Sequence, residues 1–424
     1  MPILNASAAA TWGIAALATG GVIIRPWRLP EAVWAVAGAA ALVVCGLLSW
    51  TDALAGIGRG LDVYLFLTGM MLLAELARME GLFDWLAALA VALARGSPQR
   101  LFTLVYAVGT VVTTLLSNDA TAVVLTPAVY AATRAAGASP LPYLLICAFI
   151  ANAASFVLPI SNPANLVVFG SHMPSLLEWL ARFGSASLVA IGATYFVLRL
   201  TQHRALAAER IARHVARPPL RGSGKMAAGG ILAVAACLLL CSAFDIALGW
   251  PTFICAGVTA ATIIALNRQS PWPIFRNVSW EILPLVAGLF VLVQALDRTG
   301  VIRILSDLLQ EAVASSAHGT AWGAGILVAI VSNLVNNLPA GLVAGSVLAA
   351  DHVPAQVSGA VLIGVDLGPN LSVTGSLATI LWLTALRRER QEVTMLTFLR
   401  LGFLVMPPAL ILSIACMMLS SARP

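Results

Sequence analysis

The chain has 424 residues, of which 60% are hydrophobic and only 10% are charged, and its mean hydropathy is +0.93. Its apolar stretches are too many and too long for one soluble core, so the composition excludes a soluble globular domain and predicts a polytopic membrane protein. The net charge of +6 comes from basic residues between the apolar runs. This pattern is typical of cytoplasmic loops, so we expect the lipid bilayer as a partner and no nucleic acid.

The first half of the chain divides into apolar spans separated by polar segments. The first span ends in Arg25 and Arg28 and not at a cleavable small-residue site, so we interpret it as a retained helix. Residues 82–95 suit a short interfacial helix. Residues 101–134 are about two half-helices long, with the polar run 117–121 at their middle. The expected spanning helices are residues 8–24, 31–50, 61–78, 141–170 and 176–200.

The second half repeats features of the first half at an offset of 219 residues. Gly69 and Asn118 recur as Gly288 and Asn337. Such repeats are a common construction of secondary transporters, whose solute site lies between the two halves. The same offset places apolar windows at residues 227–243, 250–269, 280–297, 360–389 and 395–419, with the interfacial and half-helix segments at 301–313 and 320–352.

The distribution of charge favours a re-entrant hairpin in each half. With hairpins, each half has five crossings, so the second half must be inverted relative to the first. If the N-terminus is outside, 19 of the 24 Lys and Arg residues fall on the cytoplasmic side and five fall outside. The longest polar segment, residues 201–225, is then a basic cytoplasmic linker between repeats of residues 1–200 and 226–424.

These observations predict an all-α polytopic membrane protein with two inverted-topology repeats. We expect about ten transmembrane helices plus two re-entrant hairpins, with both termini outside. The predicted location is the bacterial cell inner membrane.

Four polar breaks interrupt the apolar segments. Two are the hairpin tips, at residues 117–121 and 336–340, and two interrupt spans, at residues 159–165 and 366–376. A backbone break survives inside a membrane only where it is packed or lines a watery cavity. Amides that only hold helices together would scatter along helix faces, so their clustering at the breaks favours a solute site. The predicted substrate-binding residues are Ser117, Asn118, Thr121, Asn162, Asn165, Asn336, Asn337 and Ser376.

Two acids, Asp119 and Asp366, adjoin the breaks at membrane depth. A carboxylate there is costly unless it is protonated or paired, and no Lys or Arg stands nearby, so we predict that these acids couple transport to protons. The offset of 219 places Leu338 opposite Asp119 and Cys147 opposite Asp366, so their roles need not be equal. The alternative is a neutral acid that is hydrogen-bonded to a loop carbonyl.

The absence of basic residues at the breaks limits the substrate. A carboxylate or phosphate normally recruits Arg or Lys, so a neutral polyhydroxy solute or a cation fits better. Residues 222–226 lack the glycine spacing and the hydroxyl residue of a phosphate loop, which argues against ATP binding. The six cysteines lie in apolar runs without CxxC spacing, so we expect small core residues and neither disulfides nor metal ligands. No cofactor is expected.

At the four breaks the sequence resembles the arsenical pump membrane proteins of the ion transporter superfamily. The resemblance rests on residues 117–127, 159–165, 336–339 and 366–379 and extends over essentially the whole chain. It implies export of arsenite or antimonite, driven by proton exchange or assisted by a separate arsenite-stimulated ATPase, with the hairpins in a mobile transport domain. Arsenous acid is a small neutral trihydroxide that amides and hydroxyls could bind reversibly. Thiols would bind arsenic too tightly for turnover, and the cysteines lie outside the four motifs.

Other functions remain open from the sequence. A sodium/proton antiporter would use Asp119 and Asp366 with loop carbonyls as a hard-cation site, and dicarboxylate-type carriers resemble the same plan. An intramembrane enzyme would need a nucleophile with a base, or metal ligands. The five histidines fall in loops or at span ends, and no HExxH or GxSxG motif stands at the breaks. We therefore expect a transporter and not an enzyme.

Overall fold

The computed structural model is a bundle of helices and describes residues 6–170, 173–212, 219–268, 270–350 and 353–421. All of its described elements are helical, which confirms the predicted all-α class. Six described helices are long and apolar enough to cross a membrane, or seven if the bent pair α3 (Trp50–Arg59) and α4 (Leu61–Met79) forms one span. Because several expected spans are short or split, the number of ten crossings stays a prediction.

The first half of the chain follows the expected order with one addition among the spans and a short helix, α12 (His203–Ala208), at the start of the linker. The span expected at residues 31–50 ends at Val44, and a separate helix α3 follows it, bent by 48° from α4. A π-helical turn (Thr121–Leu125) joins α7 to α8. The helices are α1 (Ala6–Ile24), α2 (Glu31–Val44), α3 (Trp50–Arg59), α4 (Leu61–Met79), α5 (Leu82–Ala94), α6 (Pro98–Leu115), α7 (Asn118–Ala120), α8 (Thr126–Ala135), α9 (Leu141–Ala153), α10 (Pro163–Phe169), α11 (Leu176–Thr201) and α12 (His203–Ala208).

The second half contains nine helices in its described residues. The longest, α17, has a non-helical residue at Ser316. This residue separates the expected interfacial segment from the first arm of the second hairpin. The helices are α13 (Gly222–Ala243), α14 (Gly249–Asn267), α15 (Trp272–Asn277), α16 (Ile282–Arg298), α17 (Val301–Val335), α18 (Asn337–Ala350), α19 (Ala355–Leu367), α20 (Leu377–Arg388) and α21 (Met395–Ser421).

The helix bounds correct one expected pairing between the halves. Helices α9 and α19 end at Ala153 and Leu367, so their offset is 214 and not 219. The change lies between the second tip and α19, because α7 and α18 begin 219 residues apart at Asn118 and Asn337, whereas α9 and α19 begin 214 residues apart at Leu141 and Ala355. The placement of Cys147 opposite Asp366 is therefore wrong, and Asn152 stands opposite Asp366. Helix α20 is longer than its counterpart α10, so α11 and α21 again begin 219 residues apart.

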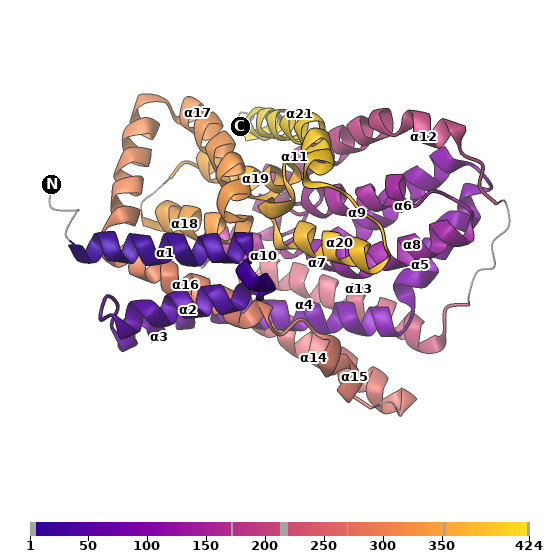
Figure 1. Ribbon diagram of the computed structural model, residues 1–424, viewed down its shortest axis with the longest axis horizontal. Helices are drawn as coiled ribbons and strands as arrows, with labels where there is room; N and C mark the ends of the chain where they lie inside the picture. The colour runs from indigo at the N-terminus through magenta and orange to yellow at the C-terminus, as the bar shows by residue number, and fades with distance from the viewer. Residues whose placement is uncertain (1–5, 171–172, 213–218, 269, 351–352, 422–424) are drawn as a thin grey trace.

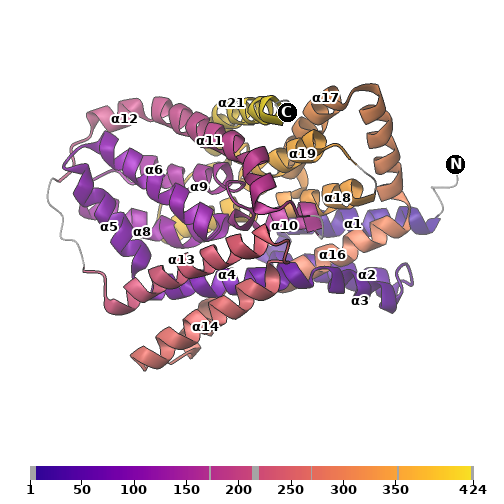
Figure 2. The ribbon, with the colours of Figure 1, turned by 180° about the vertical axis from the view of Figure 1, so that it is seen from behind.

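The two helix–tip–helix segments lie at opposite ends of the molecule (Figure 1). Helices α6 and α8 lie at one end with α5 and α12, and helices α17 and α18 lie at the other end with α1, α2 and α3. The rear view shows the same separation (Figure 2). The short α7 and the helices α9, α10, α19 and α20 lie between these ends. The polar breaks therefore gather in the interior.

Each half packs one helix closely against the other half. Helix α4 lies against α14, where a Cβ atom on Gly69 would come within 2.7 Å of the Thr252 carbonyl oxygen. Helix α16 lies against α2, where a Cβ atom on Gly288 would come within 2.7 Å of the Ala35 carbonyl carbon. Real side chains do not approach so closely, so these glycines let the backbones touch. The halves are thus joined by two reciprocal contacts.

The start of the linker is docked on the first half. The Leu206 side chain is fully buried, and the Gln99 side-chain amide donates to the Leu206 carbonyl at 3.2 Å. Glu209 accepts hydrogen bonds from the Tyr143 hydroxyl at 3.1 Å and from the Ser139 backbone N–H. The linker therefore contacts the helix ends around α6 and α9. Residues 213–218 of the linker lie outside the described residues, as do residues 1–5 and 422–424 at the predicted outside termini.

Candidate functional site

Two broken helices form the centre of the site. Helix α9 stops at Ala153, and the chain resumes as α10 at Pro163, where the missing N–H of proline is harmless. Asn162 caps α10, because its side-chain oxygen accepts from the Ala164 N–H at 3.0 Å. In the other half, Ser376 caps α20 in the same way, with the Thr379 N–H as donor at 3.1 Å. Short polar caps thus end each break and start the next helix.

Side chains bond the two breaks to each other. The Asn162 amide donates to Asp366 Oδ1 at 2.7 Å, and both side chains are buried. Asp366 Oδ2 has no hydrogen-bond partner among the described residues. A second bond joins the halves, because the Asn152 amide donates to Asn370 Oδ1 at 3.1 Å. The contact between the two broken helices is therefore held by amide groups and one acid.

The hairpin tips have similar polar turns. In the first tip, Asn118 Oδ1 accepts from the Asp119 N–H at 3.0 Å. In the second tip, Asn336 has φ of 72° and ψ of 152°, a backbone conformation that favours glycine. Its side-chain oxygen accepts from the Leu338 N–H at 3.3 Å. These turns aim Asn118 and Asn337, the first residues of α7 and α18, at the centre of the molecule.

A small inner cavity lies where the tips meet the first break. Its volume of about 10 Å³ is roughly that of one water-sized probe. Four of the predicted site residues line it together, although they come from separate segments. The lining residues are Asn118, Asp119, Asn162 and Asn337, with Leu67, Pro163, Ile282, Leu338, Leu377 and Ala378.

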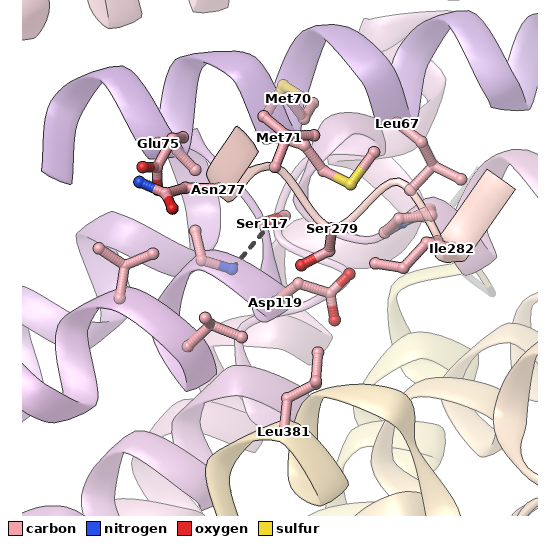
Figure 3. Close-up of a pocket in the computed structure, with 16 residues that line it drawn as sticks. Leu67, Met70, Met71, Glu75, Ser117, Asp119, Asn277, Ser279, Ile282 and Leu381 are labelled. Atoms are coloured by element: carbon pink, nitrogen blue, oxygen red, sulfur yellow. Dashed lines mark hydrogen bonds between the residues drawn. The ribbon is translucent and has the colours of Figure 1, made fainter. Parts of the chain in front are cut away.

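A larger cavity, which we call the vestibule, adjoins the inner cavity and shares Leu67, Asp119, Pro163 and Ile282 with it. Its volume is about 60 Å³. Asp119 and Ser279 point toward one another across it, and Glu75 lies beside Asn277 (Figure 3). The remaining lining residues are Met70, Met71, Ala74, Ser117, Ala120, Val123, Val124, Val278 and Leu381. Asp119 therefore stands at the junction of the two cavities.

Glu75 has a partner at the edge of the vestibule. The Arg78 Nε–H donates to Glu75 Oε2 at 2.7 Å, one helical turn away on α4. The Glu75 side chain is buried, whereas that of Arg78 is partly exposed. This guanidinium is therefore engaged by a carboxylate of the same helix.

Five of the predicted residues line neither cavity. The Thr121 hydroxyl lies 2.8 Å from the Thr113 hydroxyl, and the Asn165 amide donates to the Ser155 carbonyl at 3.0 Å. Ser376 caps α20. Their partners indicate that they hold the breaks in shape. The five residues are Thr121, Asn165, Asn336, Ser376 and Asp366.

Sequence reasoning missed two contributors. Asn333 accepts from the Ser372 hydroxyl at 2.8 Å and donates to the Gly368 carbonyl at 2.8 Å, so it ties α17 to the second break. It lies one helical turn before the second tip, and this spacing was the available signal. Ser279 lies in a short connection without any motif, so only the folded arrangement brings it to Asp119.

Comparisons with known proteins give a consistent result. Residues 17–363 match the family described as Citrate transporter. An arsenical pump membrane protein of Yersinia enterocolitica is 28% identical over 364 residues, which cover 82% of this chain and 84% of the relative. A similarly named protein of Escherichia coli is 26% identical with the same coverage. An uncharacterized transporter of Mycobacterium tuberculosis is 26% identical over 399 residues, covering 91% and 92% of the two chains.

A solved transporter structure shares the fold. The crystal structure of the Alcanivorax borkumensis YdaH transporter, described as having an unusual topology, matches with a TM-score of 0.57. The match covers 87% of each chain at 15% sequence identity. At this identity the likeness concerns the fold alone.

Proposed function

The chain belongs to the citrate transporter family, and on this premise we propose that it exports arsenite or antimonite, as the neutral trihydroxide, in exchange for protons. Family membership makes it a secondary transporter in the membrane and not an enzyme. The observation that carries the choice of substrate is the inner cavity. Amides of both hairpin tips and of the first break meet there beside Asp119, and no basic side chain is among its described lining residues.

The size and charge of the cavities favour a small neutral solute over citrate. The vestibule volume of about 60 Å³ is far below the roughly 300–1,000 Å³ of pockets for drug-sized ligands. A tricarboxylate would require Arg or Lys, but the vestibule presents the acids Glu75 and Asp119. Arg78 is already bound to Glu75. The relatives named arsenical pump membrane proteins support the same choice.

In the proposed mechanism, Asp119 exchanges a proton for the solute. On the cytoplasmic side Asp119 releases its proton to the vestibule, and its carboxylate then accepts hydrogen bonds from the hydroxyl groups of arsenous acid. Asn118, Asn162 and Asn337 would bond the remaining oxygens. On the other side a proton returns to Asp119, removes these acceptor sites and releases the solute. Asp366, which lines neither cavity, would position Asn162 by their bond of 2.7 Å.

The same proposal assigns the conformation. The vestibule is lined by the half of α4 that leads into α5, through Met71 and Glu75. The positive-inside bias places that helix end in the cytoplasm. We therefore infer an inward-facing state, with residues 1–200 and 226–424 as inverted repeats around the cavities.

A sodium/proton antiporter is the second candidate. Three buried side-chain oxygens at the broken helices, Asn152 Oδ1, Asn165 Oδ1 and Asp366 Oδ2, have no hydrogen-bond partner among the described residues. Oxygen atoms of this kind are ligands for hard cations. This observation favours a cation between the two broken helices, whereas the inner cavity favours a neutral solute.

Transport into everted membrane vesicles separates the candidates. We expect arsenite and antimonite to accumulate when the vesicle interior is acidic, and we expect sodium and citrate not to do so. Vesicles that lack any arsenite-stimulated ATPase test whether that proposed partner is required. Sodium-dependent collapse of the pH gradient, without arsenite uptake, would replace this proposal by the antiporter.

A further inference from the structure

Two cysteines from neighbouring helices face each other outside the transport site. The Cys237 sulfur on α13 lies 3.6 Å from the Cys255 sulfur on α14. Both side chains are partly exposed on the flank of the bundle, and all six cysteines are free thiols. The sequence predicted small core residues and no metal ligands. The two cysteines are 18 positions apart, so only the packing of the helices brings them together.

A third thiol stands close to this pair. Cys241 lies one helical turn after Cys237 on α13. The three thiols do not form a metal-binding cluster of His, Cys, Asp or Glu within the described part of the chain. The contact between Cys237 and Cys255 is therefore the basis of the inference.

From this contact we propose that Cys237 and Cys255 form a dithiol site that binds trivalent arsenicals. Soft metal and metalloid ions prefer thiolate ligands, and a close pair bonds one such atom at two positions. With arsenous acid, two As–O bonds break and two As–S bonds form. The thiol protons leave in two molecules of water, so no oxidant or reductant is needed.

The dithiol site is separate from the transport site. None of Cys237, Cys241 and Cys255 lines the inner cavity or the vestibule. Cys255 lies on the same helix as Thr252, one turn beyond the point where α14 touches Gly69 of α4. A bridging arsenic would therefore join α13 to the helix that connects the two halves. The identification of arsenic as the natural ligand rests on the proposed function. The ability of the thiol pair to bind a trivalent arsenical does not.

Phenylarsine oxide, a trivalent arsenical that reacts with two thiols, provides the test. The purified full-length protein, reduced with a phosphine, is mixed with the probe and freed of excess, and its arsenic is counted by elemental mass spectrometry. We expect about one arsenic per chain. Cys237→Ser and Cys255→Ser should each lower the count to background. Cys241→Ser should keep it, and so should Cys45→Ser, which removes an exposed thiol without a close partner in the described residues.

Two outcomes overturn the proposal. Either the wild-type count survives in both Cys237→Ser and Cys255→Ser, or the wild-type protein binds no probe at all. The alanine variants at both positions repeat the measurement, and gel filtration shows that each protein is folded. Arsenite uptake is measured separately in vesicles. If the protein binds the probe but does not transport arsenite, the proposal of a dithiol site stands and the proposed transport function is rejected.

Discussion

Asp119 and Asp366 lie in different surroundings, although both stand at polar breaks. Asp119 is half-buried and lines both the inner cavity and the vestibule. Asp366 is fully buried, lines neither cavity and accepts a hydrogen bond from Asn162. A group that exchanges protons with water needs a path to water. We therefore propose proton exchange for Asp119 and helix positioning for Asp366.

The first prediction separates these two roles. Asp119→Asn should abolish the stimulation of arsenite uptake by an acidic vesicle interior. It should also weaken solute binding roughly tenfold or more, because a hydrogen bond to a charged group is worth about 1.5–3 kcal/mol. Asp366→Asn keeps an oxygen for Asn162, so it should retain the response to pH. Initial uptake rates with and without a gradient measure both effects. Proton-driven uptake at the wild-type rate in Asp119→Asn would reject the mechanism.

The second prediction concerns the amides at the hairpin tips. Asn118→Ala and Asn337→Ala should each lower solute affinity by roughly 2- to 10-fold, because each removes a hydrogen bond worth about 0.5–1.5 kcal/mol. Concentration dependence of uptake gives the apparent affinity. Asn165→Ala is the contrasting variant, because Asn165 donates to backbone carbonyls within its own break. It should lower thermal stability more than affinity. Unchanged affinity in both tip variants would make the tips structural.

At the scale of elements, the close contact of α4 with α14 holds the two halves together. The third prediction is that Gly69→Ala lowers thermal stability, since the new methyl group must displace the backbone of α14 near Thr252. Overpacking of this kind costs about 1–3 kcal/mol. Gly257→Ala is the matched control on α14, because nothing lies within 4 Å of its added Cβ atom. Thermal unfolding in detergent gives the midpoint of each variant. Equal midpoints would contradict the claim that the contact between α4 and α14 requires glycine at position 69.

The sequence predicted elements well where local chemistry decides them. Proline lacks the backbone N–H that a continuing helix needs, and Pro159 and Pro163 stand four residues apart, so the broken span was visible in the chain. Helix α3 was missed because its ten residues include Asp52, Arg59 and two glycines and run from the end of the expected span 31–50 to the start of the expected span 61–78, and the bend before α4 depends on packing. The docking of Glu209 was also missed. Its partners, Ser139 and Tyr143, lie 70 and 66 positions away, and no local pattern reports such a contact.

At the scale of the whole molecule, the sequence predicted which polar groups lie near the breaks better than which of them line a cavity. Asn118, Asp119, Asn162 and Asn337 were predicted from the polar breaks and do line one cavity. The separation of cavity-lining residues from helix caps, such as Ser376, needed the fold. A helix cap and a substrate-binding residue are both short polar residues at a helix end, so composition alone cannot distinguish them.

The last prediction tests the inverted arrangement through the ends of the two hairpins. Ala135 ends α8 and Ala350 ends α18, both residues are exposed, and these helices lie at opposite ends of the molecule (Figure 1). If the repeats are inverted, Ala135 faces the cytoplasm and Ala350 faces the outside. In a variant whose six cysteines are serines, a membrane-impermeant maleimide added to intact cells should label Ala350→Cys and not Ala135→Cys.

Everted vesicles should give the reverse labelling, because their cytoplasmic face is exposed. Ala208→Cys at the end of α12 serves as a linker control and should follow Ala135→Cys, since both helices lie at the same end of the molecule. Labelling of both hairpin ends from one side would mean that the halves are parallel. The site could not then alternate its access by exchanging the roles of two inverted hairpins, so the transport mechanism depends on this result.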